Sequence, residues 1–132
     1  MYKRFCKTIL CFLDEIQKVM ENIIFNELKL RGFNVDVGVV EYNYKDSEGK
    51  SRRSKLEVDF IANLGSKKFY IQSAFNIDDE QKKEQETASL NRIDDSFSKI
   101  VVVKDNIEPW QDDKGIQYIG IEQFLLEEDW LR

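Results

Sequence analysis

The sequence predicts one α/β domain with a central mixed sheet flanked by helices, in the order α-β-β-β-α-β-β-α. A long amphipathic segment opens the chain, and three runs rich in β-branched and aromatic residues follow it. A later run, KIVVVK (99–104), is almost continuously apolar, which is typical of a strand buried on both faces. The 132 residues suffice for one domain with a real core and are few for two, so we expect residues 1–132 to form a single domain.

The first element is expected to be a long amphipathic helix, or two joined ones, ending at Arg31–Gly32. Apolar residues recur from Phe5 to Leu28 at a spacing near 3.6, and Gly32 is a natural C-cap. Cys6 and Cys11 lie roughly 140° apart around such a helix and cannot easily pair. Because these are the only cysteines, we expect two buried free thiols in a cytosolic protein.

The start of the chain has a basic beginning and a short apolar run, like a secretory leader. However, it lacks a small-residue cleavage site, and Asp14 and Glu15 follow the apolar run at once. We therefore expect no signal peptide. No run of about 18 or more uncharged apolar residues exists, so we expect no membrane span and a cytoplasmic location.

The remaining elements follow from turn residues and alternating apolar positions. Residues 33–64 predict a β-hairpin with a long polar tip, KDSEGKSR, and LGSKK then turns into a third strand over 68–75. Residues 77–93 favour a helix capped by Asp78 or Asp79. After the strand at 99–104 we expect a loop over 106–115, a strand over 115–121 and a closing helix over 121–131. Trp110 and Trp130 are expected to pack on that loop and helix.

The net charge of −5 argues against strong nonspecific binding to nucleic acid. A solvated hairpin best explains the local basic cluster, and phosphate contact is the alternative. The cluster consists of Lys45, Lys50, Arg52, Arg53, Lys55, Lys67 and Lys68. The chain has no histidine, which excludes His-based zinc sites and His-activated nucleophiles.

Chemistry concentrates in EVDFIANLGSKKFYIQSAF (57–75). Side chains alternate along strands, so Glu57 and Asp59 share a face of the second strand, and Gln72 and Ala74 share a face of the third. If the turn pairs these strands, one face gathers Asp59, Gln72 and Ala74. Carboxylates of this kind can hold Mg²⁺, which needs only one or two of them plus water. Ordinary interpretations also stand: Glu57 as a surface acid, and Gln72 as a polar residue satisfied at a strand edge.

A helix packed beside this sheet could add Glu21 or Glu27. An acid on the first helix, an Asp at the end of the second strand and (D/E)-x-K on the third are the signature of the PD-(D/E)XK, or restriction-endonuclease-like, superfamily. From Met20 to Leu126 the chain resembles one member of it, the uncharacterised C-terminal domain of a family of predicted bacterial AAA-type ATPases. The segments MENIIFNELKLRGFNVDVG, EVDFIA, KKFYIQSAF, SKIVVVKD and GIQYIGIEQFLL carry the resemblance.

The resemblance implies that Glu21 and Asp59 hold a divalent metal at the scissile phosphate. It places Gln72 at the position of the second strand acid and Ala74 at that of the lysine. A neutral carbonyl at Gln72 weakens metal affinity, and alanine has neither charge nor donor. Lys67, Lys68 or Arg92 could substitute for the lysine, although the first two lie at the wrong end of the strand.

Residues 9–19, ILCFLDEIQKV, resemble the Walker B segment of the same ATPases. The chain contains no G-x-x-x-x-G-K-[ST] phosphate loop, so we expect no bound nucleotide and no ATPase activity. Residues 1–19 are therefore interpreted as a Walker B-like remnant reused as helix, in which Asp14 and Glu15 have lost their role. Residues 20–132 form the expected core.

Three functions follow. The first is a non-catalytic or degenerate nuclease-like domain, accessory to an ATPase in its relatives, that binds a protein partner or nucleic acid. The second is a Mg²⁺-dependent nuclease that hydrolyses phosphodiester bonds with Glu21, Asp59 and a displaced basic residue. The third is an inactive remnant of an AAA-type ATPase that forms homo-oligomers.

Overall fold

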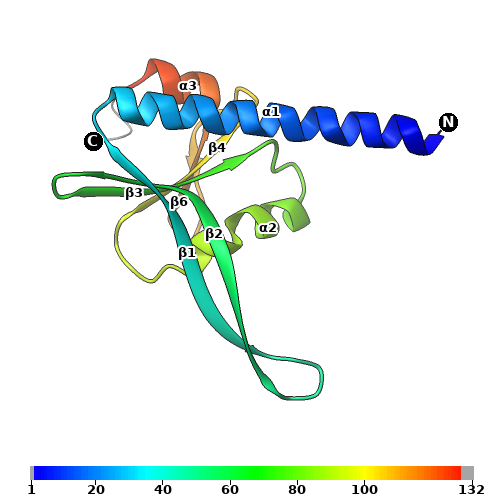
Figure 1. The fold of residues 1–132 in the computed structure, drawn as a ribbon. Coiled ribbons are helices and arrows are strands. Elements are labelled where there is room, and N and C mark those ends of the chain that lie inside the picture. The colour runs from blue at the N-terminus through cyan, green and yellow to red at the C-terminus, as the bar shows by residue number, and fades with distance from the viewer. Residues whose placement is uncertain (1, 129–132) are drawn as a thin grey trace.

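The computed structural model describes residues 2–128, and side chains from residue 11 onward. It confirms the α/β class: a six-stranded mixed sheet, ordered β1-β2-β3-β4-β6-β5, is flanked by helices (Figure 1). The helices are α1 (Tyr2–Leu30), α2 (Glu80–Asn91) and α3 (Ile121–Leu126), and the strands are β1 (Asn34–Lys45), β2 (Ser51–Leu64), β3 (Lys67–Ala74), β4 (Ser98–Val103), β5 (Trp110–Gln111) and β6 (Ile116–Gly120).

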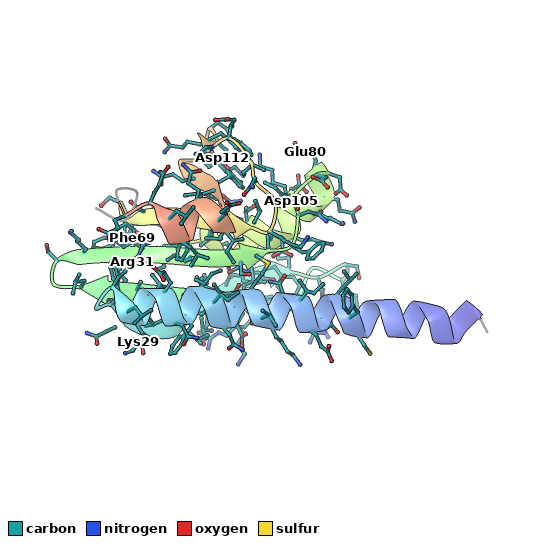
Figure 2. All side chains as sticks on the ribbon, turned by 90° about the horizontal axis from the view of Figure 1, so that it is seen from above. Lys29, Arg31, Phe69, Glu80, Asp105 and Asp112 are labelled. Carbon is teal, nitrogen blue, oxygen red and sulfur yellow. The ribbon has the colours of Figure 1, made fainter. Side chains whose placement is uncertain are left out.

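Helix α1 confirms the expected long helix and its C-cap. Gly32 has φ of 91°, and the backbone N–H of Phe33 donates to the carbonyl of Leu28 at 3.0 Å, which closes the helix end. The Walker B-like stretch 9–19 lies within this helix. Figures 1 and 2 show the N-terminal turns of α1 running past the sheet. The expectation of two buried thiols is wrong for Cys11, which is exposed because this part of α1 has little to pack against, and the side chain of Cys6 is outside the described ones.

Strands β1 and β2 form the expected hairpin, which projects from the body with its tip exposed (Figure 1). The pairing contains one irregularity. From Asp36 to Gly38, β1 advances two residues, while β2 advances three from Ile61 to Val58. Strand β2 therefore holds one residue more than its partner here, and such bulges bend a strand and redirect its side chains.

Strands β3, β4 and β6 form the parallel part of the sheet. A two-residue turn joins β2 to β3, and Gly65 supplies the positive φ of 60° that this turn needs. Helix α2 makes the crossover from β3 to β4. As expected, an aspartate caps it: the Asp79 carboxylate accepts a hydrogen bond from the backbone N–H of Lys82 at 2.7 Å.

Two expectations for the C-terminal part need correction. The predicted loop over 106–115 contains a two-residue strand, β5, which pairs antiparallel with β6 and adds a strand to the expected order. The closing helix ends at Leu126, five residues earlier than expected, because Glu127 is already extended at φ −104° and ψ 132°. Trp130 lies outside the described residues.

The core has two parts, one on each face of the sheet. Helices α1 and α3 contribute Ile24, Leu28 and Phe124 to the first cluster, where Phe33 and Phe69 meet edge to face at 5.8 Å. The second cluster lies on the α2 side and contains Val58, Tyr70, Ala74, Leu90, Val101, Val103, Ile116 and Tyr118.

Candidate functional site

Three of the four residues singled out in the sequence meet in one cleft. Glu21 from α1, Asp59 from β2 and Gln72 from β3 line an open cleft of about 480 Å³. The wall also includes Asp14 and Gln17 of α1 and Lys82 and Glu86 of α2. The cleft thus lies between two helices at the carboxyl end of β3, as the strand alternation predicts for Asp59 and Gln72.

The bulge in β2 places Asp59. Pairing between β2 and β3 ends at Phe60 and Ile71, so the next backbone groups no longer bond across the two strands. Instead, the backbone N–H of Ser73 donates to Asp59 Oδ2 at 2.8 Å, and the N–H of Asp59 donates to Gln72 Oε1 at 3.1 Å. These two bonds satisfy the two amides where the strands diverge, and they fix the carboxylate in the wall of the cleft.

Gln17 ties α1 to the same point of β3. Its side-chain amide donates to the carbonyl of Ser73 at 3.1 Å and to the hydroxyl of Ser73 at 3.0 Å. Ser73 is buried, so these bonds are shielded from water and position the adjacent turns of the helix. One turn further along α1, Glu21 reaches the cleft.

The cleft disfavours negative charge. Burial raises the pKa of Asp59 to about 6, and the charges of Glu21, Glu86 and Glu57 push it in the same direction against the hydrogen bond from Ser73. Burial also raises the pKa of Glu86, with a further contribution from Glu21, although a hydrogen bond from the Gln72 amide opposes it. Three carboxylates from three elements therefore share a site in which no described cation lowers the pKa of Asp59.

Ala74 does not line the cleft. It is fully buried in the second core cluster, so the position of the expected lysine is apolar. The proposed substitutes also lie elsewhere: Lys68 Nζ packs over the rings of Tyr70 and Phe97, and Arg92 stacks on Tyr42 at 3.7 Å. Lys67, at the opposite end of β3, is exposed and is not among the residues that line the cleft.

Sequence reasoning did not single out several residues of the cleft wall, and the two charged ones among them are Lys82 and Glu86. They lie four positions apart on α2, so they share one face of that helix. Lys82 Nζ donates to Asn76 Oδ1 at 3.3 Å. Their i, i+4 spacing was a usable signal, once α2 was known to pack beside the carboxyl end of β3.

Other acids have different roles. Glu27 pairs with Arg31 at 3.0 Å and is not among the residues that line the cleft. Glu57 is exposed, as its ordinary interpretation requires. Asp14 does line the cleft, whereas its neighbour Glu15 is exposed and is not part of the wall, so half of the Walker B-like acid pair faces the site.

The donor set fits a hard divalent cation. Glu21, Asp59 and Glu86 offer carboxylate oxygens, and Mg²⁺ binds through one or two of these together with water. Within residues 2–128, however, no three His, Cys, Asp or Glu side chains are already arranged around one metal position. Burial, followed by the charges of Glu21, Glu86 and Glu57, raises the pKa of Asp59.

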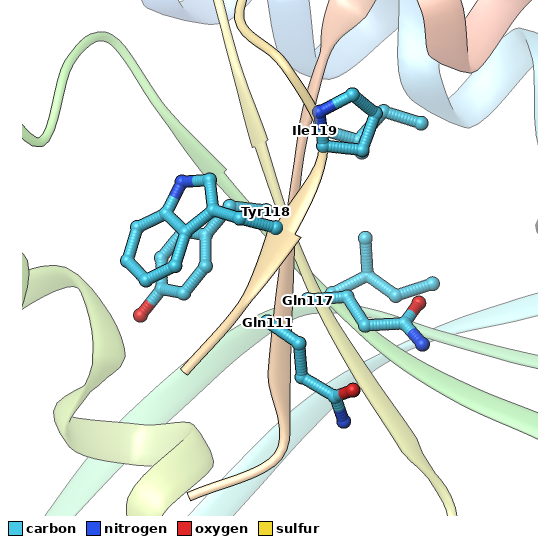
Figure 3. Close-up of a pocket in the computed structure, with 7 residues that line it drawn as sticks. Gln111, Gln117, Tyr118 and Ile119 are labelled. Carbon is cyan, nitrogen blue, oxygen red and sulfur yellow. The ribbon is translucent and has the colours of Figure 1, made fainter. Parts of the chain in front are cut away.

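A second cavity, of about 360 Å³, lies at the β5–β6 edge (Figure 3). Its walls include Ile100, Pro109 and Ile119, and it is mainly apolar. Trp110 and Tyr118 also line it, and their rings stack at 4.1 Å, in agreement with the packing role expected for Trp110. This edge offers packing surface, and its walls hold no cluster of carboxylates comparable to the cleft.

Among residues 2–128, no helix is both long enough and apolar enough to cross a lipid bilayer.

The chain is similar to a protein of Haemophilus influenzae that is described only as uncharacterized. The two are 35% identical over 108 residues, which is 82% of this chain. The chain spans 23% of the length of that relative, so most of the relative has no counterpart here. No family model matches the chain.

Proposed function

We propose that this chain is a non-catalytic, nuclease-like domain whose cleft binds a divalent cation and, through it, the phosphate backbone of a nucleic acid. The observation that carries the proposal is the burial of Ala74. The position where the superfamily keeps a water-activating lysine is packed in the apolar core, fully buried. The metal-binding acids are retained while the group that completes catalysis is absent.

Gln72 supports the same conclusion. Its carbonyl oxygen accepts from the backbone of Asp59, and its amide group donates to Glu86. Both ends of the side chain are therefore engaged within the protein. A glutamine held in this way organises the two acids around it, and it is poorly placed to ligate a metal or to polarise water.

The charge of the cleft explains why a cation is part of the proposal. Glu21, Asp59 and Glu86 repel a phosphate, so an anion can approach only after the acids are neutralised. When bound, Mg²⁺ supplies positive charge shared between carboxylates and phosphate oxygens. Asp59 and Glu21 are the residues that would hold it. The backbone N–H of Ser73 fixes the carboxylate of Asp59, and the hydrogen bond from Gln17 to Ser73 positions the part of α1 that carries Glu21.

One observation favours a second candidate, a working Mg²⁺-dependent nuclease. Lys82 lines the cleft from α2, on the same helix face as Glu86. An ammonium group there could stabilise charge on a phosphate without occupying the strand position. In this candidate Asp59 and Glu21 hold the metal, and Lys82 acts as the displaced basic residue.

We also propose a protein partner, an origin for residues 1–19 and a cellular location. An accessory role beside an ATPase and the origin of residues 1–19 rest on the resemblance described above. A cytoplasmic location is supported by Cys11, because exposed free thiols persist best in reducing compartments.

One experiment separates the candidates. Fluorescence anisotropy measures binding of a labelled DNA duplex with and without Mg²⁺, and gel electrophoresis of the same samples reports cleavage. Wild type is compared with Asp59→Asn, and with Asp46→Asn as a matched control in the same hairpin. We expect Mg²⁺-dependent binding without cleavage, lost in Asp59→Asn and kept in Asp46→Asn.

Cleavage that disappears in both Asp59→Asn and Lys82→Ala would establish the second candidate and overturn the first. Binding that is equal with Mg²⁺ and with EDTA would contradict both, because neither allows phosphate into an unneutralised acidic cleft.

A further inference from the structure

The projecting β1–β2 hairpin bears aromatic rings and a guanidinium group stacked on its α2 side (Figure 1). Tyr42 and Tyr44 are two residues apart on β1, so their side chains lie on the same face of the ribbon. Their ring centroids are 6.0 Å apart. Arg92, the C-cap residue of α2, places its guanidinium 3.7 Å from the centroid of the Tyr42 ring. A cation and two rings therefore follow one another from the body of the domain toward the hairpin tip.

The end of this stack nearest the tip is exposed and positively charged. Tyr44 is 45% exposed, and Arg52 lies opposite it in the register of the hairpin. Asp46 pairs with Arg52 at 2.9 Å and offsets part of that charge. Arg92 is also exposed, and within residues 2–128 no carboxylate forms an ion pair with it. The face thus combines an exposed ring with available positive charge.

Rings and guanidinium groups together suit the unpaired bases of a nucleic acid. Every base has a flat π face that can stack on an aromatic side chain, and guanidinium groups bind the phosphates that join the bases. A duplex keeps its bases stacked on one another, so it offers such a face only its phosphates. An acidic peptide would use the two arginines and would leave the ring of Tyr44 unused.

We infer that Tyr42, Tyr44, Arg52 and Arg92, which we call the stacking face, bind a single-stranded segment of nucleic acid. A base stacks on the exposed ring of Tyr44, and the two arginines contact the neighbouring phosphates. The inference rests on the proposed function for the class of ligand alone. It does not require the metal of the cleft, because the stacking face has cations of its own.

Helix α2 connects the stacking face to the cleft. Glu86 lines the cleft, and Arg92 follows it by six positions, which is roughly 9 Å along a helix that rises about 1.5 Å per residue. A strand with a rise of about 3.4 Å per nucleotide covers that length with about three nucleotides. One nucleic acid can therefore reach the cleft with its backbone and the stacking face with its unpaired bases.

The first test is fluorescence anisotropy of a labelled oligothymidylate in EDTA, which removes the metal that the cleft requires. We expect wild type to bind the oligothymidylate more tightly than a blunt duplex of the same length. Tyr44→Ala should weaken this binding about tenfold, because it removes one stacked base. Tyr44→Phe is the matched control: it keeps the ring and should bind like wild type.

The second test concerns the charge of the stacking face. Arg92→Gln should weaken binding and should reduce the slope of log affinity against log salt concentration by about 0.7, because one phosphate contact is lost. Arg53→Gln is the matched control. It removes the same charge from the opposite face of the hairpin, where Arg53 is exposed, and should retain wild-type affinity.

Four results would overturn the inference. The first is a wild type that does not bind the oligothymidylate in EDTA, which leaves Mg²⁺-dependent binding at the cleft untouched. The second is a Tyr44→Ala variant that binds like wild type. The third is equal binding of the duplex and the single strand. The fourth is poly-glutamate that displaces the label as well as unlabelled oligothymidylate does, which would assign the face to an acidic peptide.

The same measurements separate this inference from the proposed function. Tyr44-dependent binding of the oligothymidylate in EDTA, together with duplex binding that Mg²⁺ does not change, would support the stacking face and contradict the cation in the cleft.

Discussion

Two aspartates of the same β-hairpin occupy opposite electrostatic environments. Asp46, at the hairpin tip, accepts hydrogen bonds from the backbone N–H groups of Glu48 and Lys50 and from Arg52 at 2.9 Å, chiefly the last of which lowers its pKa. Asp59, in the cleft, has one backbone donor and two acidic neighbours from other elements, and its pKa is raised to about 6. The first acid helps to build a turn, and the second is the acid to which the proposed function assigns a cation.

The difference lies in what surrounds each carboxylate, and it is the physical basis on which Asp59 is proposed as a site acid. A structural acid collects as many donors as its oxygens can accept, because that stabilises the fold. A carboxylate that is buried beside other acids lowers the stability of the fold when it is ionised. A cation that binds there would offset this loss of stability.

The largest expected effect comes from replacing Asp59 by asparagine. The folded-state pKa of Asp59 lies above the ordinary value of 3.8, so the native protein binds the extra proton between pH 4 and pH 6 and loses stability as the pH rises through that window. Asp59→Asn removes this cost, and the oxygen of the new amide can still accept from Ser73. We expect the variant to be more stable at pH 7 by roughly 1–3 kcal/mol, with a flatter profile in urea denaturation measured from pH 4 to pH 7.5.

A lower stability of Asp59→Asn at pH 7 would contradict this prediction. It would mean that Asp59, like Asp46, contributes to the fold itself.

The next effect concerns the cation. Millimolar Mg²⁺ should stabilise wild type by about 1 kcal/mol when it exceeds its dissociation constant several-fold, and it should leave Asp59→Asn unchanged. Thermal denaturation with MgCl₂, against NaCl at matched ionic strength, measures this. Equal stabilisation of Asp46→Asn and wild type is the control, and equal stabilisation of Asp59→Asn would place the cation outside the cleft.

An effect of similar size is expected from Gln72→Glu, which adds a carboxylate beside Asp59 and Glu86. Like charges in a partly buried site should lower the free energy of unfolding by about 1 kcal/mol without metal, and Mg²⁺ should restore more stability than it gives wild type. Paired melts with EDTA and with Mg²⁺ test this. A variant that is destabilised equally in both would show that the glutamine serves only packing.

The smallest effect belongs to Asp46→Asn. The folded-state pKa of Asp46 lies below 3.8, so its contribution is present at neutral pH and disappears as the pH falls below that value. Because this pair is exposed, the melting temperature should fall only slightly at pH 7 and should match wild type at acid pH. A marked effect between pH 4 and pH 6 would remove the contrast with Asp59.

Local patterns predicted the parts of the site that local structure decides. Strand alternation and the Gly65 turn placed Asp59 and Gln72 together. The residues alone left Glu21 and Glu27 as alternatives on the first helix, and the resemblance favoured Glu21. The sequence did not predict that Glu86 and Lys82 line the cleft. Their position depends on how α2 packs against the sheet, and no periodicity within residues 77–93 reveals that packing. Strand β5 was not predicted for a similar reason. Two residues are too few to show an alternating pattern, and only their pairing with β6 makes them a strand.

Cys11 and Ala74 show the limit of inferring burial from composition. Cysteine is usually buried, yet α1 extends past the sheet and leaves Cys11 exposed. The resemblance places Ala74 where a lysine is expected, and the structure shows that this position belongs to the apolar core.

The bulge in β2 also changes the phase of the strand. Beyond it, the even-numbered Phe60 and Ala62 belong to the cluster on the α1 side, whereas the even-numbered Val58 belongs to the cluster on the α2 side. Odd and even positions therefore exchange faces at Asp59. Residues can be added or removed at the hairpin tip without disturbing this exchange, whereas deleting one residue at 59–60 would remove the bulge, restore regular pairing with β1 and keep Val58 on the α2 side.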